Sequence, residues 1–202
     1  MKNNSHISFK IKDLLCPVNK SRVSSCRENQ IEFEGGLKYP IFDGKPILID
    51  ERKSLFSIKG IMDKVNTTQN SDYSDKKNIK NLIRKNLPRL SYDGTVEKRY
   101  TDLKKQSNNG LILVIGAGDK GSFYKNIFGD NAIMSDVHLL YDCDIVFDSH
   151  QIPFKDESFS LIVLPQVLEH VHKPWIVASE IERVLKSNGR VLIEVPFGFP
   201  IH

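Results

Sequence analysis

Runs rich in apolar residues mark the second half of the chain. They cover residues 111–115, 144–148, 159–164 and 190–195, and polar or turn-forming residues separate them. A continuous apolar run is typical of a strand that is buried on both faces of a sheet. The pattern therefore predicts strands in the interior of a parallel sheet.

A helical pattern lies between the last two runs. Apolar residues recur there at Ile176, Val177, Ile181, Val184 and Leu185, close to the spacing of one helix face. A proline at 174 suits the first turn of this helix, and residues 187–189 (Ser-Asn-Gly) supply a stop. Strands that alternate with helices imply parallel pairing through right-handed crossovers. We expect an α/β fold with a doubly wound parallel sheet of about five strands over residues 109–202.

Three glycines follow the first apolar run. Gly116, Gly118 and Gly121 let the backbone turn sharply and approach a ligand closely, and Asp136 follows about one strand later. An acidic side chain at that distance can bind the hydroxyls of a ribose. The segment predicts a nucleoside-containing cofactor, although an ordinary strand–helix turn would show the same glycines.

An ordered series of motifs narrows this choice. It consists of Val114-Ile115-Gly116-Ala117-Gly118, Ser135-Asp136, Asp148 with Ile152-Pro153-Phe154, Asp156-x-Ser158-Phe159, residues 167–171 (VLEHV) and residues 180–189 (EIERVLKSNG). Over residues 110–202 this series resembles the class I S-adenosylmethionine-dependent methyltransferases, and most of all the branch with the ubiquinone/menaquinone-type small-molecule enzymes. A nicotinamide-dependent oxidoreductase would share only the glycines and Asp136. The resemblance implies a Rossmann-like domain with S-adenosyl-L-methionine as its cofactor.

The resemblance also implies roles for individual residues. The glycine turn would pass under the methionine part of the cofactor, Asp136 would hold the ribose, Asp148 with Ser149 would meet the adenine amino group, and Gln166 would line the substrate-facing side. The implied cofactor-binding set is Ile115, Gly116, Ala117, Gly118, Asp136, Asp148, Ser149 and Gln166. On turn chemistry alone Asp136 could instead cap a helix, Asp148 could be a turn residue, and Gln166 could be a solvated loop residue.

Two departures from the family pattern concern activity. The family usually has an acidic residue where this chain has Val114, and a glycine is common where it has Lys120. We expect the loss of the acidic group to weaken cofactor binding by about 1–2 kcal/mol. Related enzymes also continue beyond the strand at 190–195, so that strand would form an open sheet edge that a partner protein could cover.

No catalytic residue is assigned. The sulfonium already activates the methyl group, so the protein mainly aligns the acceptor and excludes water. A general base helps only a weakly acidic acceptor, and the candidates by type are His150, His170, His172 and His202.

The first fifty residues carry a second resemblance. Residues 14–20 (LLCPVNK) and 36–48 (GLKYPIFDGKPIL) resemble the small zinc-ribbon-like domain of the tRNA-methyltransferase activator family. Asp43-Gly44 between two apolar stretches predicts a β-hairpin. Only Cys16 and Cys26 lie in this region, and two thiols cannot close a tetrahedral zinc site, so we expect no metal.

Charge divides the chain into three parts. Residues 1–50 carry a net charge of +2, residues 51–109 carry +7, and residues 110–202 carry −5. We expect a β-rich module at 1–52, a basic linker with short helices at 53–108, including one near 79–90, and the methyltransferase-like domain at 109–202. The basic segment could contact phosphate groups, but a solvated linker explains it as well, and its few aromatic residues do not favour nucleic acid.

Cysteine content and hydropathy address the cellular compartment. Three cysteines do not form a disulfide framework, and no apolar stretch has the length of a membrane span. We therefore expect a cytoplasmic protein. Three functions remain open: a methyltransferase acting on a small-molecule or glycan-type acceptor, a degenerate cofactor-binding or scaffold protein of the same fold, and an NAD-dependent oxidoreductase.

Overall fold

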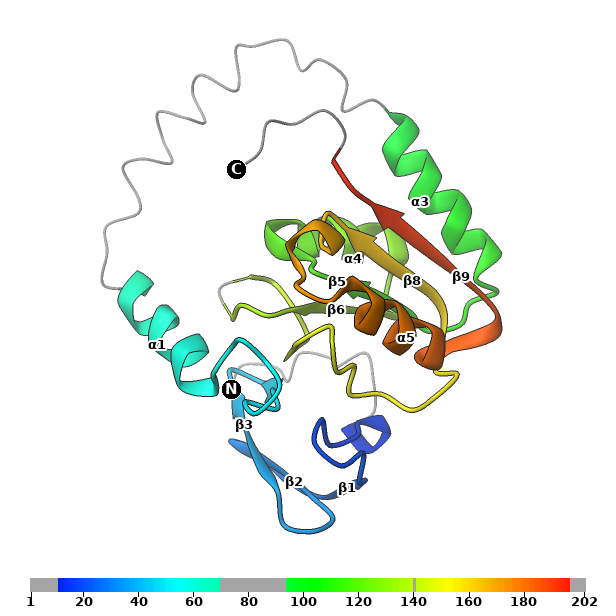
Figure 1. The fold of residues 1–202 in the computed structure, drawn as a ribbon. Coiled ribbons are helices and arrows are strands. Elements are labelled where there is room, and N and C mark those ends of the chain that lie inside the picture. Colours follow the sequence, from blue (N-terminus) through cyan, green and yellow to red (C-terminus); the bar gives the residue numbers. More distant parts are fainter. Residues whose placement is uncertain (1–10, 70–93, 140, 197–202) are drawn as a thin grey trace.

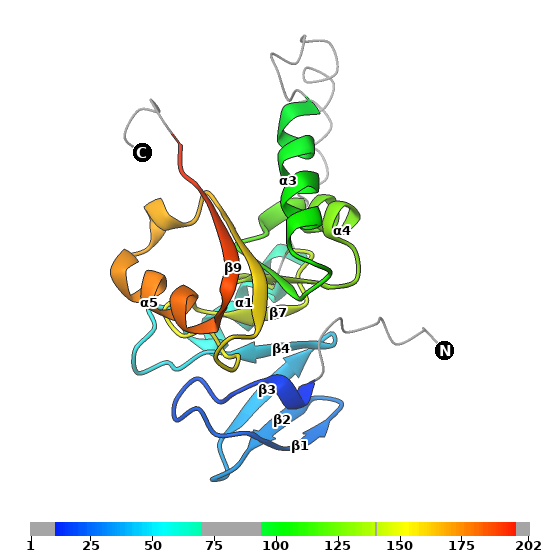
Figure 2. The same cartoon turned by 90° about the vertical axis from the view of Figure 1, so that its right-hand side faces the viewer.

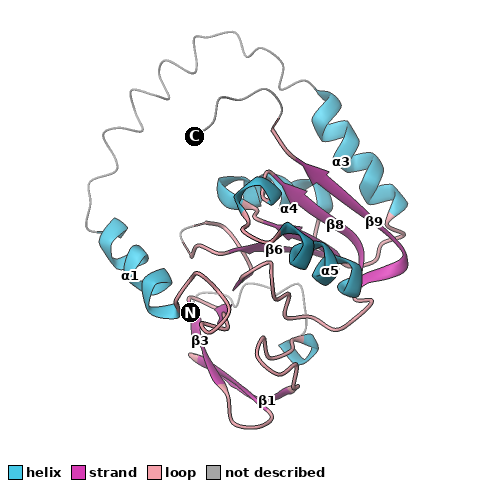
Figure 3. Cartoon of the chain, in the orientation of Figure 1, coloured by secondary structure: helices cyan, strands magenta, loops and turns pink. Residues whose placement is uncertain are grey.

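A single sheet of nine strands runs through the described part of the computed structural model, which comprises residues 11–69, 94–139 and 141–196 (Figures 1 and 3). The strand order is β1-β2-β3-β4-β7-β6-β5-β8-β9. The strands are β1 (Val23–Arg27), β2 (Gln30–Phe33), β3 (Lys38–Phe42), β4 (Lys45–Leu48), β5 (Ile112–Ile115), β6 (Ala132–Asp136), β7 (Ile145–Phe147), β8 (Phe159–Pro165) and β9 (Leu185–Glu194).

Helices cover both faces of the parallel half of this sheet. Figure 2 shows α5 on one face and α3 with α4 on the other. The helices are α1 (Ile58–Gln69), α3 (Gly94–Gln106), α4 (Gly121–Phe128) and α5 (Pro174–Val184), and short 3-10 turns occupy Ile11–Asp13, Gly118–Lys120 and Leu168–His170. None of these helices is long and apolar enough to cross a bilayer.

The predicted five-strand parallel sheet is confirmed. Strands β7, β6, β5, β8 and β9 pair in parallel, with β5 in the centre. Alternate residues of β5 face opposite sides, so Leu113 packs in the core beneath α5 while Ile112 and Val114 pack in the core beneath α3 and α4. Burial on both faces explains why this strand is apolar at every position.

The N-terminal strands extend the same sheet. The predicted hairpin is present: β3 pairs antiparallel with β4, and Asp43 (φ 49°) and Gly44 (φ 75°) form its turn in the left-handed conformation that such hairpins require. Strand β4 then pairs in parallel with β7, with Ile47 opposite Val146. Strands β1 to β4 therefore share one hydrogen-bonded sheet with the parallel strands of the second half of the chain.

The two N-terminal cysteines lie in different surroundings. Cys16 is fully buried, with its sulfur 3.9 Å from the Tyr39 hydroxyl, whereas Cys26 is exposed on β1. Across the described residues, no group of three or more His, Cys, Asp or Glu side chains is placed to hold a metal ion.

Part of the segment expected to be a linker is a packed helix. Tyr100 of α3 is 2% exposed and makes edge contacts with Phe123, Tyr124 and Phe128, with ring centroids 5.5–6.2 Å apart. Its hydroxyl also donates a hydrogen bond to Glu194 of β9. Residues 94–106 therefore form a helix, as expected for part of the basic segment, but this helix packs on the core; the bounds of the linker stay a prediction, and the helix expected near 79–90 lies outside the described residues.

The boundary between α5 and β9 also differs from the prediction. Pro174 begins the helix as expected, but the helix ends at Val184, and the strand begins at Leu185 instead of residue 190. Leu185 has an extended backbone and pairs with Phe159, and the next paired residue is Arg190. The predicted stop at 187–189 is thus a bulge within the strand, because pairing with β8 already starts before it.

Strand β9 is the outermost strand of the described sheet. Its apolar side chains Val191 and Ile193, and Val195 just beyond it, remain 43%, 42% and 56% exposed. The open edge was expected from the sequence, and the apolar residues on it are typical of a surface that another chain segment covers.

Arg183 links α5 to the loop that follows β7. Its guanidinium donates hydrogen bonds of 2.8 Å to the carbonyl oxygens of Ile152 and Phe154 and to the carboxylates of Glu180 and Asp156. Glu180 in turn accepts a hydrogen bond from the backbone N–H of Ile152. This network fixes residues 150–156 beside the helix.

Replacing this guanidinium should destabilise the fold. Lysine cannot donate five hydrogen bonds in one plane, so Arg183→Lys leaves buried acceptors unpaired, and we expect it to lower the free energy of unfolding by about 2–3 kcal/mol. Urea denaturation measures this change. Arg190→Lys on the exposed part of β9 is the matched control, and an equal loss in both variants would contradict a special role of Arg183.

The same network should make stability depend on acid pH. Burial alone would raise the pKa of Glu180, but hydrogen bonds from Arg183 and the charge of Lys20 outweigh burial and lower this pKa below 4.5. A lowered pKa in the folded state gives stability that is present above the unfolded pKa and is lost as the pH falls through the folded value. We therefore expect the free energy of unfolding to decrease as the pH is lowered below about 4.5.

Glu180→Gln should make that fall shallower, and exposed Glu182→Gln should not. Denaturation at a series of pH values measures both. The fall that remains in Glu180→Gln should come from other carboxyls with lowered pKa, such as Asp50 and Asp148.

Candidate functional site

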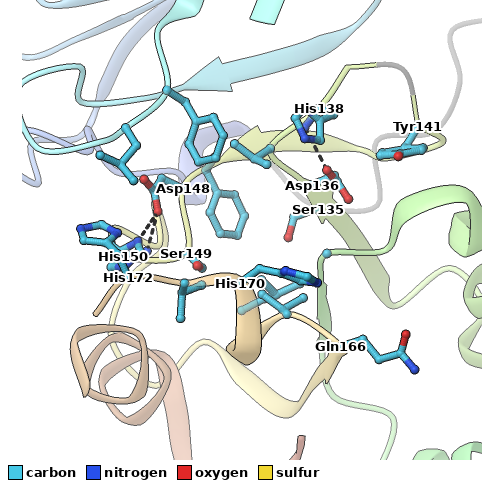
Figure 4. A pocket seen from close by; sticks show the side chains of 18 residues that line it. Ser135, Asp136, His138, Tyr141, Asp148, Ser149, His150, Gln166, His170 and His172 are labelled. Atoms are coloured by element: carbon cyan, nitrogen blue, oxygen red, sulfur yellow. Dashed lines mark hydrogen bonds and ion pairs between the residues drawn. The ribbon is translucent and has the colours of Figure 1, made fainter. Parts of the chain in front are cut away.

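A crevice opens at the carboxyl ends of the central parallel strands. It has a volume of about 480 Å³, and its walls come from the ends of β5, β6, β7 and β8, from residues 55–56 after β4, and from residues 170–172 before α5. Figure 4 shows the two carboxylates, Asp136 and Asp148, on the same crevice, with Gln166 at the far end from Asp148. Ligands bind at this edge of open parallel sheets because loops diverge there.

The glycine bend forms one wall of the crevice. Gly116 adopts φ 72°, which a side chain rarely tolerates, and a Cβ there would lie 2.2 Å from a methyl group of Val167. The N–H groups of Gly116 and Ala117 both donate to the carbonyl of Ser135, each at 2.9 Å. The glycine is therefore needed for the turn itself and for the close packing of Val167.

Asp136 stands at the end of β6 and fastens the bend. One carboxylate oxygen accepts the N–H of Gly118 at 3.0 Å, and the other accepts the N–H of His138 at 2.9 Å. The side chain is buried and nevertheless lines the crevice. An aspartate in this position holds the turn together and still presents unused lone pairs to a ligand.

Asp148 follows β7 and is held by two different segments. The Ser54 hydroxyl donates to one oxygen at 2.5 Å, and the backbone N–H and ring Nδ1 of His150 meet the other at 3.0 and 2.6 Å. Burial alone would raise the pKa of Asp148, but these hydrogen bonds outweigh burial and lower it. The carboxylate is therefore charged at neutral pH, and it joins the segment after β4 to the crevice.

His150 is buried beside this carboxylate. Its side chain is 10% exposed, and its ring lies 4.3 Å from the ring of His172. The Nε2 atom is buried without a hydrogen-bond partner among the described residues. Because Nδ1 faces a carboxylate, Nε2 is the ring atom that is available to a ligand.

Aromatic and imidazole rings surround the Asp136 end. His138 makes edge contacts with Phe56 and Tyr141, with centroids 6.2 and 6.0 Å apart. The turn beside them is close to α4: a Cβ at Gly121 would lie 1.9 Å from the carbonyl oxygen of Asp142, and the Asp142 carboxylate accepts a hydrogen bond from Ser122. These flat side chains and the fixed turn make an apolar wall that suits a nucleobase or another planar group.

The structure brings most of the predicted residues to the crevice. Ile115, Gly116, Asp136, Asp148, Ser149 and Gln166 line it. Ala117 is buried in the core on the α4 side, and Gly118 gives its N–H to Asp136, so neither lines the crevice. Val114, the departure from the family pattern, is fully buried in the core.

Several lining residues were not predicted from the sequence. Leu55 and Phe56 reach the crevice only because β4 pairs with β7, which no local pattern indicates. Ser135 and Val137 adjoin a predicted aspartate, so their position next to the strand end was a usable signal. His138 and Tyr141 carried no such signal, because their loop is irregular.

The charge of the crevice is distinctive. Two carboxylates line it, and no lysine or arginine does within the described residues. Such a lining favours a neutral or cationic ligand over an anionic one.

Parts of the chain are similar to known proteins. Residues 131–193 match the family model described as "Methyltransferase domain". Two uncharacterized proteins of Methanocaldococcus jannaschii are similar to the chain: one is 34% identical over 102 residues, and the other is 35% identical over 51 residues. The alignments cover 46% and 25% of this chain, and 44% and 25% of the relatives, so the chain spans less than half the length of either relative.

Solved structures with a similar arrangement include a Bacillus halodurans protein (21% identity, TM-score 0.42, 50% of each chain) and the YcgJ protein from Bacillus subtilis (22% identity, TM-score 0.39, 48% of this chain and 50% of the other). Phosphoethanolamine N-methyltransferase 2 from Haemonchus contortus is 20% identical, with a TM-score of 0.35, over 48% of this chain and 27% of the other. The segment from residue 131 to residue 193, which supplies Asp136, Asp148 and most of the crevice, thus matches the methyltransferase domain family.

Proposed function

We propose that the crevice binds S-adenosyl-L-methionine and that the protein is a methyltransferase. The observation that carries this proposal is the convergence of Asp136, Asp148 and the Gly116 bend on one crevice at the ends of three adjacent strands. The match of residues 131–193 to a methyltransferase domain supports it. Asp136 would hold the ribose hydroxyls, Asp148 and Ser149 would adjoin the adenine, and Ile115 and Gly116 would adjoin the methionine part.

The charge and the hydrogen bonds of the crevice fit this cofactor better than a nicotinamide dinucleotide. A pyrophosphate needs free N–H groups at the glycine turn or basic side chains. Here the N–H groups of Gly116, Ala117 and Gly118 are bonded to Ser135 and Asp136, and no lysine or arginine of the described residues lines the crevice. A sulfonium cofactor carries positive charge, which the two carboxylates favour.

The bound cofactor would supply an electrophilic methyl group, so the chain itself needs only to position the acceptor and to exclude water. Phe56, Tyr141, Val167 and Val171 contribute apolar side chains to the lining of the crevice. Gln166, at the end of β8, would line the acceptor side. We assign no catalytic base: His150 has an orienting carboxylate, Asp148, but lies at the end of the crevice away from Gln166 (Figure 4).

The acceptor remains a prediction from the resemblance. We propose a small-molecule or glycan-type acceptor in the cytoplasm, and a protein partner on the open edge of β9. The exposed side chains of Val191 and Ile193, which line a hollow beside α5, support such a partner, because exposed apolar residues that lie together often mark an interaction surface.

A second function has an observation in its favour. Val167 packs against the glycine bend, and Val114 replaces the usual acidic group, so contacts to the methionine end of the cofactor are fewer than the family pattern provides. The alternative is a cofactor-binding or scaffold protein without turnover.

Calorimetric titration separates these functions. We expect S-adenosylmethionine to bind with one site per chain and NAD not to bind, because the crevice offers carboxylates, the N–H groups of the glycine bend are already bonded, and no lysine or arginine of the described residues lines it. Transfer of labelled methyl groups to components of a cell extract would establish turnover, and binding without any transfer would favour the scaffold. Binding of NAD alone would contradict the proposal.

Asp136 provides the sharpest single-residue test. Asp136→Asn keeps the shape but removes the charge that would hold the ribose, so we expect cofactor binding to weaken about 10- to 150-fold, as for a lost hydrogen bond to a charged group. Asp130→Asn, an exposed position before β6, is the matched control. Thermal unfolding of both variants identifies any loss of stability that comes from the Gly118 hydrogen bond. Unchanged cofactor binding in a folded Asp136→Asn variant would contradict the proposed position of the ribose.

A further inference from the structure

A second hollow adjoins the crevice and differs from it in charge. It has a volume of about 490 Å³ and lies between the turn at residues 17–20, the segment after β4 and the start of α5. Four basic side chains line it: Lys20, Arg52, Lys53 and Lys173. Among the described residues, Glu180 is the one acidic residue in its lining. Two hollows of opposite charge therefore lie next to each other.

Half of this positive charge is neutralised within the protein. Arg52 forms hydrogen bonds of 2.9 and 3.1 Å with the carboxylate of Asp50, and Lys20 lies 3.2 Å from the carboxylate of Glu180. Lys53 and Lys173 are exposed, and neither ammonium group forms an ion pair or hydrogen bond within the described residues. Lys173 therefore faces the hollow without an ion-pair partner among the described residues, and Lys53 interacts only at longer range with Asp50, whose carboxylate Arg52 already binds.

Two buried polar atoms also lack partners here. Nε2 of His150 and Oε1 of Gln151 are both buried without a hydrogen bond in the described structure, and both residues line the hollow. Buried polar groups in folded proteins are nearly always paired, and an unpaired one needs an explanation such as a bound ligand. Because His150 and Gln151 are neighbours in the chain and line the same charged hollow, one bound ligand would pair both buried atoms.

We propose that this hollow binds a small phosphate ester that also carries a hydroxyl group. The phosphate would accept hydrogen bonds from Lys53 and Lys173, which act as point charges. Because Nδ1 of His150 faces Asp148, the unpaired Nε2 is the ring atom that would meet the phosphate. The hydroxyl would donate to Gln151, and the apolar side chains of Val18 and Ile176 would line the rest.

The hollow is distinct from the proposed cofactor crevice, although the two share His150 and His172. It lies at the Asp148 end, whereas Gln166, on the proposed acceptor side, lies at the other end (Figure 4). The inference therefore goes beyond the proposed function and stands whether or not a methyl group is transferred. Because His150 contacts Asp148, the two ligands should change each other's affinity by the same factor.

Titration with glycerol 3-phosphate tests the proposal, with glycerol and sodium chloride of equal ionic strength as ligand controls. The single tryptophan of the chain, Trp175, lies two residues after Lys173, so its fluorescence should report binding alongside calorimetry. We expect saturable binding of the phosphate ester with one site per chain and no binding of glycerol.

Removing the two unpaired charges should abolish most of this affinity. In Lys53→Gln/Lys173→Gln we expect binding about tenfold weaker or more, as for lost charge-assisted hydrogen bonds. Lys38→Gln/Lys186→Gln removes two exposed lysines outside the hollow and should leave binding unchanged. These substitutions are on the surface, so both variants should fold, and thermal unfolding verifies it.

Three results would overturn the proposal: no saturable binding of glycerol 3-phosphate, an equal loss in both double variants, or binding of a short single-stranded RNA with none of the phosphate ester. S-adenosylmethionine titrated into the same samples keeps the two hypotheses separate. Cofactor binding without phosphate-ester binding contradicts only this inference, and the reverse result contradicts only the proposed function.

Discussion

The parallel pairing of β4 with β7 is the constraint on which the described arrangement depends. It places the end of β4 beside the end of β7, so residues 50–57 arrive at the functional edge of the sheet. There Ser54 donates to Asp148, Phe56 joins the crevice wall, and Arg52 and Lys53 enter the basic hollow. Without that pairing, the N-terminal strands would form a separate unit, and neither hollow would have its present walls.

His150 lies between the two hollows. Its Nδ1 faces Asp148 of the crevice, and its unpaired Nε2 is buried at the hollow lined by lysines. A ligand that contacted Nε2 would therefore be linked through this one ring to the Asp148 carboxylate. The network of Arg183 and Glu180 holds the loop that carries this histidine.

Local pattern in the sequence was sufficient for most of the parallel sheet and for Asp136, which was expected from its distance to the glycine turn, whereas Asp148 was implied only by the family resemblance. Apolar runs mark four of the five parallel strands, and β6, which ends at Asp136, was not among them. The Asp43-Gly44 hairpin was equally local. The docking of α3 was missed even though Val96, Tyr100 and Leu103 have helical spacing, because the surrounding lysines suggested a solvated segment. The β4–β7 pairing and the bulge before Arg190 could not be predicted, since both are decided by contacts between segments remote in sequence.

The close approach of Asp142 to Gly121 limits how this protein can vary. The carbonyl oxygen of Asp142 occupies the place of any side chain at position 121, although the backbone there is ordinary helix. Positions in and beside this turn therefore differ in the substitutions that they tolerate. Exchanging His138 or Tyr141 would alter which planar groups the crevice admits. Position 121 must stay a glycine, because a side chain there would push the turn away from α4. Selection for a new ligand would therefore act on the rings and leave their support untouched.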